Sequence, residues 1–225
     1  MTPYYADDLV TLYHGDCREI TAWLEADVLV TDPPYGIDGH LSAGWKGRRP
    51  RGGHVRVHAK PSWDRTLDGR DAALGMWGDR PYAVFGSPAR LDAPLPCREF
   101  PLVWDKDMVG MGDVTFPWGR GYEIIYVNGP GWRGKRESPV LRYPHNTRAA
   151  TIAGVPTPKP IALMGALILK APPGTIADPF AGSGSTLIAA RNLGRHAIGV
   201  EIEERYCENA ARRLAQQPLP LGGAA

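Results

Sequence analysis

The segment Asp178-Pro-Phe-Ala-Gly-Ser-Gly184 constrains the fold more than any other part of the chain. Residues 174–177 before it are few, apolar and bounded by turn-forming residues, which predicts a short buried strand. Residues 185–192 after it predict a helix, with Ser185 as the capping residue. The glycines between them let the backbone turn tightly and let a ligand approach closely. A strand, a glycine loop and a helix in this order predict a ligand-binding unit of an α/β fold.

Two acidic residues indicate which kind of ligand this unit would bind. Asp178 stands at the mouth of the loop, where its carboxylate would repel the phosphate that a helix N-terminus otherwise attracts. It suits a cationic or hydroxyl-bearing ligand instead. The next predicted strand, 196–200, delivers Glu201 at its tip, where a βαβ unit places the residue that binds a ribose diol. For Gly182 and Gly184 taken alone, an ordinary strand–helix turn remains the alternative.

A second strand tip carries the sequence Asp32-Pro-Pro-Tyr35. Residues 28–30 predict a buried strand, and two prolines cannot continue its hydrogen-bond ladder, so the chain must leave the sheet there. Asp32 therefore lies at the carboxyl end of a strand, where open α/β sheets place their sites. The structural alternative is a rigid strand exit with a capping acid.

Together these motifs resemble those of the amino-group DNA methyltransferases, which methylate adenine N6 or cytosine N4. Asp32-Pro-Pro-Tyr35 resembles the catalytic tetrapeptide of that family, Asp178–Gly184 its S-adenosylmethionine loop, and Pro156–Pro160 the segment before that loop. The catalytic motif precedes the cofactor loop, as in the circularly permuted β-type subgroup. The resemblance covers roughly residues 9–36 and 80–215. It implies a single α/β domain, 1–225, with a Rossmann-like, mostly parallel seven-stranded sheet that contains one antiparallel strand.

The resemblance also implies roles for individual residues. The Asp32 carboxylate and the Pro33 carbonyl would each accept a hydrogen bond from an exocyclic amine, and Pro33 and Pro34 would stiffen the turn. Tyr35 would stack on a base flipped out of the duplex. Aspartate at the first position favours adenine N6 over cytosine N4. The implied cofactor is S-adenosylmethionine, with S-adenosylhomocysteine as product and no metal. The residues expected to bind it are Asp16, Lys159, Asp178, Phe180, Ala181, Gly182, Ser183, Gly184, Ser185 and Glu201.

Some of these assignments have alternatives. Asp16 is equally well explained as a helix N-cap. In the segment before the loop, Pro158 stands where the family usually has Gln or Glu, which leaves the roles of Thr157 and Lys159 open. Pro96-Cys97 resembles the nucleophile pair of cytosine-C5 methyltransferases. It lies in a proline-rich link, however, and the tetrapeptide already supplies an amine site.

Charge distribution indicates where double-stranded DNA would bind. The net charge is only +2, yet residues 40–60 carry six Lys or Arg and no acid. We interpret 36–79 as a basic, mobile loop of the functional kind, with a solvated loop without a role as the alternative. Residues 131–158 are polar and form a short candidate recognition region, and 216–225 a frayed tail. The expected phosphate-binding residues are Lys46, Arg48, Arg49, Arg51, Arg56 and Lys60.

The remaining segments complete the expected domain. Further strands are predicted at 10–13, 81–86, 99–104 and 122–127, and helices at 17–25, 159–170 and 203–214. Three separated cysteines suggest neither disulfides nor a zinc site. No apolar run has membrane-spanning length and no signal sequence opens the chain, which favours a cytoplasmic protein. A homodimer is possible. A catalytically silent DNA-binding protein with this fold is the alternative function, whereas a nucleotide-dependent oxidoreductase lacks its GxGxxG motif.

Overall fold

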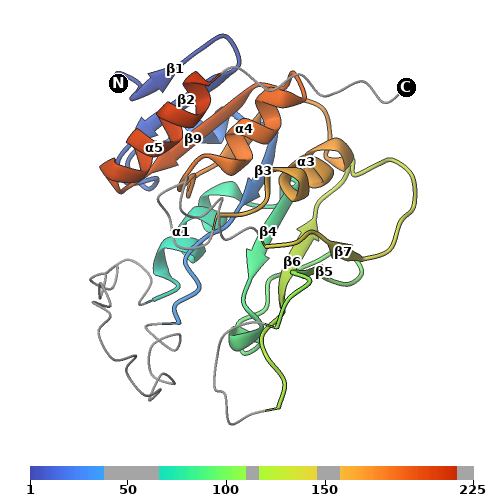
Figure 1. The fold of residues 1–225 in the computed structure, drawn as a ribbon. Helices are drawn as coiled ribbons and strands as arrows, with labels where there is room; N and C mark the ends of the chain where they lie inside the picture. Colours follow the sequence, from blue (N-terminus) through green and yellow to red (C-terminus); the bar gives the residue numbers. More distant parts are fainter. Residues whose placement is uncertain (38–65, 110–116, 146–157, 217–225) are drawn as a thin grey trace, which may run out of the picture.

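A computed structural model describes residues 1–37, 66–109, 117–145 and 158–216. Its centre is one twisted sheet (Figure 1) in which the strands follow the order β1-β2-β9-β8-β3-β4-β6-β5-β7. The strands are β1 (Tyr5–Ala6), β2 (Val10–His14), β3 (Val28–Thr31), β4 (Tyr82–Gly86), β5 (Leu102–Asp105), β6 (Tyr122–Asn128), β7 (Val140–Arg142), β8 (Ile176–Asp178) and β9 (Ala197–Glu201).

Most neighbouring strands of this sheet are parallel. The run β2-β9-β8-β3-β4 is parallel throughout, and β5 pairs in parallel with β7. Strand β6 is antiparallel to both β4 and β5, and β1 is antiparallel to β2. The expected α/β class with a mostly parallel sheet is confirmed. The expected count of seven strands and one antiparallel strand is wrong, because the short edge strands β1 and β7 extend the sheet to nine in the described residues.

Helices cover both faces of the sheet. Three of them, α3 (Ile161–Lys170), α4 (Ser185–Asn192) and α5 (Glu204–Ala215), lie on one face against β2, β3, β8 and β9 (Figure 1). The other face is covered by η1 (Ala22–Glu25) and α1 (Asp68–Trp77), and a short turn, η3 (Pro88–Arg90), follows β4. None of the helices in the described ranges is long and apolar enough to cross a membrane.

The alternation of side chains along the strands divides the core into two clusters. Val28 and Val30 pack with α3, α4 and α5, whereas Leu29 between them packs on the opposite face. There the buried indoles of Trp23 and Trp77 stack with their ring centroids 5.8 Å apart and join η1 to α1. Val28, Leu29 and Val30 are all fully buried, as expected for a central strand of a parallel sheet.

Three local expectations are wrong. The helix predicted at 17–25 is only the 3₁₀ turn η1, because the Trp23 indole donates to the Cys17 carbonyl and draws the chain into a turn. The predicted loop 36–79 is not a loop throughout, because Asp68–Trp77 within it form helix α1. Ser185 does not cap α4: the cap residue is Gly184 in the left-handed conformation, with φ of 79°. The tail from 217 onward lies outside the described residues.

Candidate active site

The carboxyl ends of four parallel strands bring the predicted acidic residues to one edge of the sheet. Asp16 follows β2, Glu201 ends β9, Asp178 ends β8, and Asp32 follows β3, which are consecutive neighbours in the sheet. Thr31 at the end of β3 donates through Oγ1 to Asp178 Oδ1 at 2.6 Å. This bond joins the two motifs across 147 residues of sequence. The Asp32–Tyr35 tetrapeptide and the glycine loop therefore lie side by side at one edge of the sheet.

The glycine loop is fixed by buried carboxylates. Asp178 is 2% exposed and also accepts a bond from the Phe180 amide, at 3.2 Å. Burial raises the pKa of its carboxyl to about 7, although the bonds to Thr186 and Thr31 act in the other direction. Glu201 accepts from the amide of Gly182, whose φ of 53° favours glycine, at 2.7 Å. These acids hold the loop, and each carboxylate retains lone pairs for a ligand.

Helix α5 holds the outer part of the loop, and one buried hydroxyl next to it has no hydrogen-bond partner among the described residues. Arg213 on α5 donates to both the carbonyl and the hydroxyl of Ser183. Ser185 Oγ at the start of α4 is buried and has no hydrogen-bond partner among the described residues. A buried hydroxyl without a partner costs free energy, which a bound polar ligand would offset. Asp16 instead accepts from the Arg18 backbone and guanidinium, so its carboxylate is engaged in a local turn.

Asp32 belongs to a cluster of charged side chains. One oxygen of its carboxylate accepts from the Tyr35 hydroxyl and the other from the Lys159 ammonium. Lys159 also pairs with Glu123 at 3.2 Å, and Glu123 pairs with Lys106 at 2.7 Å. Tyr35 reaches Glu123 as well, at 3.2 Å. Two carboxylates and two ammonium groups thus share one half-enclosed space around a tyrosine.

Aromatic rings surround the ammonium group of Lys159. Its Nζ lies 5.1 Å from the centroid of Phe85 and 5.8 Å from those of Tyr35 and Trp104, within the range of cation–π attraction. Burial by itself lowers the pKa of Lys159, but Asp32 and Glu123 more than reverse this, so the lysine stays charged. The cluster therefore combines aromatic faces with fixed charge.

The sequence indicates Lys106 and Glu123 only weakly, because Trp104–Lys106 and Tyr122-Glu123 have a partial resemblance to strand-edge segments of the same methyltransferase family, and it does not indicate His145. All three reach the site because of strand direction. Lys106 follows β5, and β6 is antiparallel to β5, so Glu123 near the start of β6 lies at the same edge. His145 follows β7, which is parallel to β5, and its amide donates to the Lys106 carbonyl at 3.1 Å. The available signal for Lys106 and Glu123 was a charged residue beside an apolar strand, and no comparable signal marked His145.

Other predicted residues lie elsewhere. The six basic residues from Lys46 to Lys60 lie outside the described residues, as do 146–157 of the candidate recognition region. Cys97 lies toward the opposite edge of the sheet, because Arg98 beside it donates to Val127 near the end of β6. Within the described ranges, no three His, Cys, Asp or Glu side chains come together as a metal site requires.

Comparison with known proteins identifies the family. The profile of a DNA methylase family, the N6-adenine and N4-cytosine methylases, matches residues 51–212. The chain belongs to this family. It is 42% identical to YubD of Escherichia coli (strain K12), which is described as a methylase, over 93% of each chain. It is 26% identical to the type II methyltransferase M.ScaI of Streptomyces caespitosus, over 97% of this chain and 86% of the relative.

Solved structures share the fold of this amino-group DNA methylase. The M1.HpyAVI–SAM complex superposes with a TM-score of 0.62 at 19% identity, covering 92% of this chain and all of the other. The PvuII DNA methyltransferase, described as cytosine-N4-specific, also gives 0.62, at 15% identity, over 96% of this chain and 90% of the other. TTHA0409 of Thermus thermophilus gives 0.54 in complex with S-adenosyl-L-methionine, at 21% identity over 91% of this chain and 94% of the other.

Proposed function

We propose that this DNA methylase transfers a methyl group from S-adenosylmethionine to the N6 amine of adenine in double-stranded DNA. The observation that carries the proposal is the Thr31–Asp178 bond, which places Asp32-Pro-Pro-Tyr35 beside the glycine loop at one sheet edge. A base amine and a methyl donor held at these two motifs would be neighbours. Most of the rate enhancement then comes from positioning and electrostatics.

The residues of the tetrapeptide act on the amine. An exocyclic amine is a poor nucleophile because its lone pair is delocalised into the ring. Asp32 and the Pro33 carbonyl accept hydrogen bonds from its two N–H groups and favour a pyramidal nitrogen with a localised lone pair. The flipped base stacks on Tyr35. The amine lone pair forms the N–C bond, the S–C electron pair stays on sulfur, and the amine proton then leaves to Asp32 or water.

The glycine loop and its acids hold the cofactor, which supplies an electrophilic methyl on a sulfonium. Glu201 binds the ribose hydroxyls, and Asp178 faces the ammonium of the methionine part, directly or through water. Phe180 and the loop to Ser185 line the methionine chain, and the partnerless Ser185 hydroxyl donates to its carboxylate. Two relatives in fold, M1.HpyAVI and TTHA0409, are described as complexes with this molecule, which supports the assignment.

Adenine is proposed as the target because the tetrapeptide begins with aspartate. Cytosine N4 is the second candidate, favoured by the similarity in fold to the cytosine-N4-specific PvuII enzyme. To decide, purified protein is incubated with labelled S-adenosylmethionine and DNA of mixed sequence, and the DNA is digested to nucleosides. Label in N6-methyldeoxyadenosine supports the proposal, and label in N4-methyldeoxycytidine supports the second candidate. DNA binding without label in either nucleoside would identify a catalytically silent relative.

A further inference from the structure

We propose that Lys159 and Glu123 are positioning residues of the methyl-transfer site, which hold the Asp32 carboxylate charged and oriented toward the target amine. The proposal rests on the function proposed above. It moves Lys159 from the cofactor side of the site, where sequence motifs place it, to the base side. It also gives a role to Glu123, which the sequence motifs indicated less clearly than Asp32 or Lys159.

The contacts of Lys159 carry this inference. Its side chain is only 5% exposed, and its ammonium lies on Asp32 and Glu123 rather than on any described residue of the glycine loop. An isolated ammonium could not stay charged at such a site, because leaving water costs several kcal/mol. Both carboxylates are therefore needed to keep Lys159 protonated. In return, Lys159 supplies the positive charge that keeps Asp32 ionised.

Glu123 holds the two partners of Asp32 in place. Its carboxylate accepts from Lys159 at 3.2 Å and from the Tyr35 hydroxyl at 3.2 Å, and these groups donate to the two oxygens of Asp32. Glu123 is itself fixed by Lys106 at 2.7 Å. Each oxygen of the Asp32 carboxylate is thus held by one donor, and its remaining lone pairs can accept a hydrogen bond from an amine. Its side chain is 30% exposed, so this free side is accessible.

This cluster of buried charges is expected to contribute little to the stability of the folded state. Buried ion pairs commonly contribute no more than apolar residues of the same volume. The cluster also sits next to three aromatic side chains, Tyr35, Phe85 and Trp104, which could pack on an apolar residue instead. Chemistry at Asp32 gives a reason for the charges, because a protonated Asp32 would accept the amine proton poorly.

The titratable neighbours of Asp32 within the described ranges enter the pH argument. Burial and the charge of Glu123 raise the pKa of Asp32, while Lys159 and the Tyr35 hydroxyl oppose the rise. Burial raises the pKa of Glu123 too, but Lys159 and Lys106 outweigh it and keep Glu123 ionised. His145 has its pKa lowered by burial and by Lys106, so it adds no charge at neutral pH. Asp178 lies near enough for Asp32 to raise its pKa.

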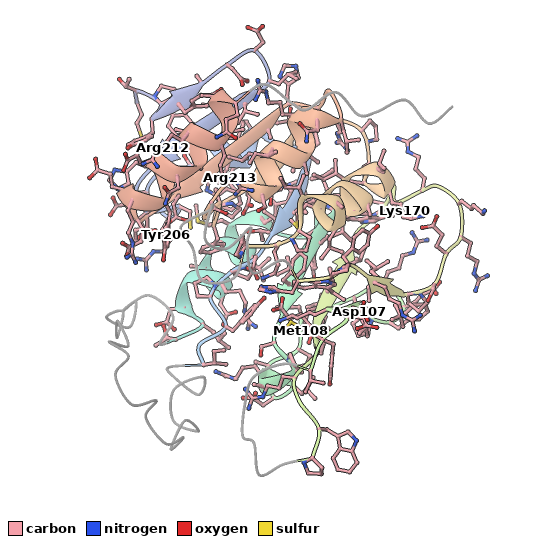
Figure 2. The ribbon with its side chains drawn as sticks, viewed as in Figure 1. Asp107, Met108, Lys170, Tyr206, Arg212 and Arg213 are labelled. Carbon is pink, nitrogen blue, oxygen red and sulfur yellow. The ribbon has the colours of Figure 1, made fainter. Side chains whose placement is uncertain are left out.

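The test is the pH dependence of methyl transfer in Lys159→Met. Activity requires ionised Asp32, so it falls as pH drops through the pKa of that carboxyl. Loss of an adjacent opposite charge should move this midpoint upward by about 1–3 pH units. At pH above the new midpoint much of the activity should return, and affinity for S-adenosylmethionine should be unchanged. Lys170→Met is the matched control, since Lys170 lies at the other end of α3 (Figure 2) and, among the described residues, pairs with Glu137 and the Lys135 carbonyl.

Glu123→Gln separates positioning from a general loss of structure. Removing this negative charge lowers the Asp32 pKa, so the midpoint should move down, while kcat falls because Tyr35 and Lys159 lose a partner. A structural defect would shift neither midpoint and would lower the activity of both variants alike. The carboxyl pKa of Asp32 is also measured directly by ¹³C NMR with labelled aspartate, which requires no turnover, and Asp32→Asn identifies the signal.

The outcomes distinguish this inference from the proposed function. An unchanged Asp32 pKa in Lys159→Met overturns the inference, as does weakened cofactor affinity with an unchanged midpoint. Wild-type protein that methylates no DNA overturns the proposed function and with it the catalytic role of this cluster. Active wild type with an unshifted Lys159→Met variant overturns the inference alone.

Discussion

Asp32 is the residue on which the proposed reaction depends most. Asparagine has the same shape but lacks the charge and offers one acceptor oxygen instead of two. We expect Asp32→Asn to lower kcat by about 10²–10³-fold, the usual cost of losing one preorganised charge-stabilising group. Cofactor affinity should stay within about twofold, because Asp32 contacts Tyr35 and Lys159 but not the glycine loop. Single-turnover methyl transfer and cofactor titration measure both; a loss confined to cofactor affinity would contradict the assignment.

Asp178 gives a prediction about stability. Its pKa is raised to about 7 in the folded protein, against about 3.9 in an unfolded chain. Between these values the folded state binds more protons than the unfolded state, so wild-type stability falls as pH rises through this window. The amide of the Asp178→Asn variant would not titrate. The free energy of unfolding of this variant minus that of wild type should therefore increase by up to about 4 kcal/mol from about pH 4 to 8.

Denaturant unfolding across this pH range checks the Asp178 prediction. Asp32 and Glu201 also have raised pKa values, but both are present in both proteins, so the difference contains only the titration of Asp178 and its coupling to Asp32. A difference independent of pH would show that burial does not raise the Asp178 pKa.

At the scale of elements, α5 supports the glycine loop by hydrogen bonding. Arg213 is one of two adjacent arginines on this helix (Figure 2), and it reaches the carbonyl and hydroxyl of Ser183. Arg213→Met keeps the length of the side chain and removes these bonds, so cofactor affinity should fall about tenfold, the equivalent of one good hydrogen bond. Arg212→Met is the control, because Arg212 pairs instead with exposed Glu208 one turn away. Isothermal titration calorimetry measures the cofactor affinity of both variants. Equal affinities would show that the bonds from Arg213 to Ser183 do not support cofactor binding.

Elements with a clear apolar pattern were predictable from the sequence. Strands β2, β3, β4, β6 and β9 and helices α4 and α5 lie within about two residues of the predicted ranges. Helix α1 was not predicted, because it contains Gly69 and Gly75 and each glycine costs about 1 kcal/mol relative to alanine. It forms because Trp77 stacks on Trp23, more than fifty positions earlier in the sequence. A contact of that range leaves no local pattern.

At the scale of the whole molecule, the site is assembled by sheet order. The sequence motifs placed Asp32, Asp178 and Glu201 at strand tips, and the parallel order β9-β8-β3 brings those tips together. The charged cluster could not be predicted in this way. Glu123 reaches Lys159 and Tyr35, the two partners of Asp32, because β6 runs antiparallel to β4 and β5, which is a property of the topology rather than of any motif.

The last prediction concerns how a molecule with a net charge of only +2 holds a polyanion. Phosphate contacts supply much of the affinity for DNA and come from Lys and Arg. The densest basic stretch is 46–60, which follows the Asp32–Tyr35 tetrapeptide closely in the sequence. Arginine also pairs well with guanine edges, so this stretch can contribute to base readout.

Neutralising Lys46, Arg48, Arg49 and Arg51 together should weaken DNA binding and flatten its dependence on salt. Each lost phosphate contact lowers the slope of log K against log salt by about 0.9, so four contacts predict a decrease of up to about 3.6. Cofactor affinity should not change, because the glycine loop and its acids are intact. The measurement is DNA affinity by fluorescence anisotropy from low to moderate salt. Equal slopes for wild type and the fourfold variant would mean that this stretch does not touch phosphate, and the affinity would then have to come from basic residues elsewhere, such as those at 133–142.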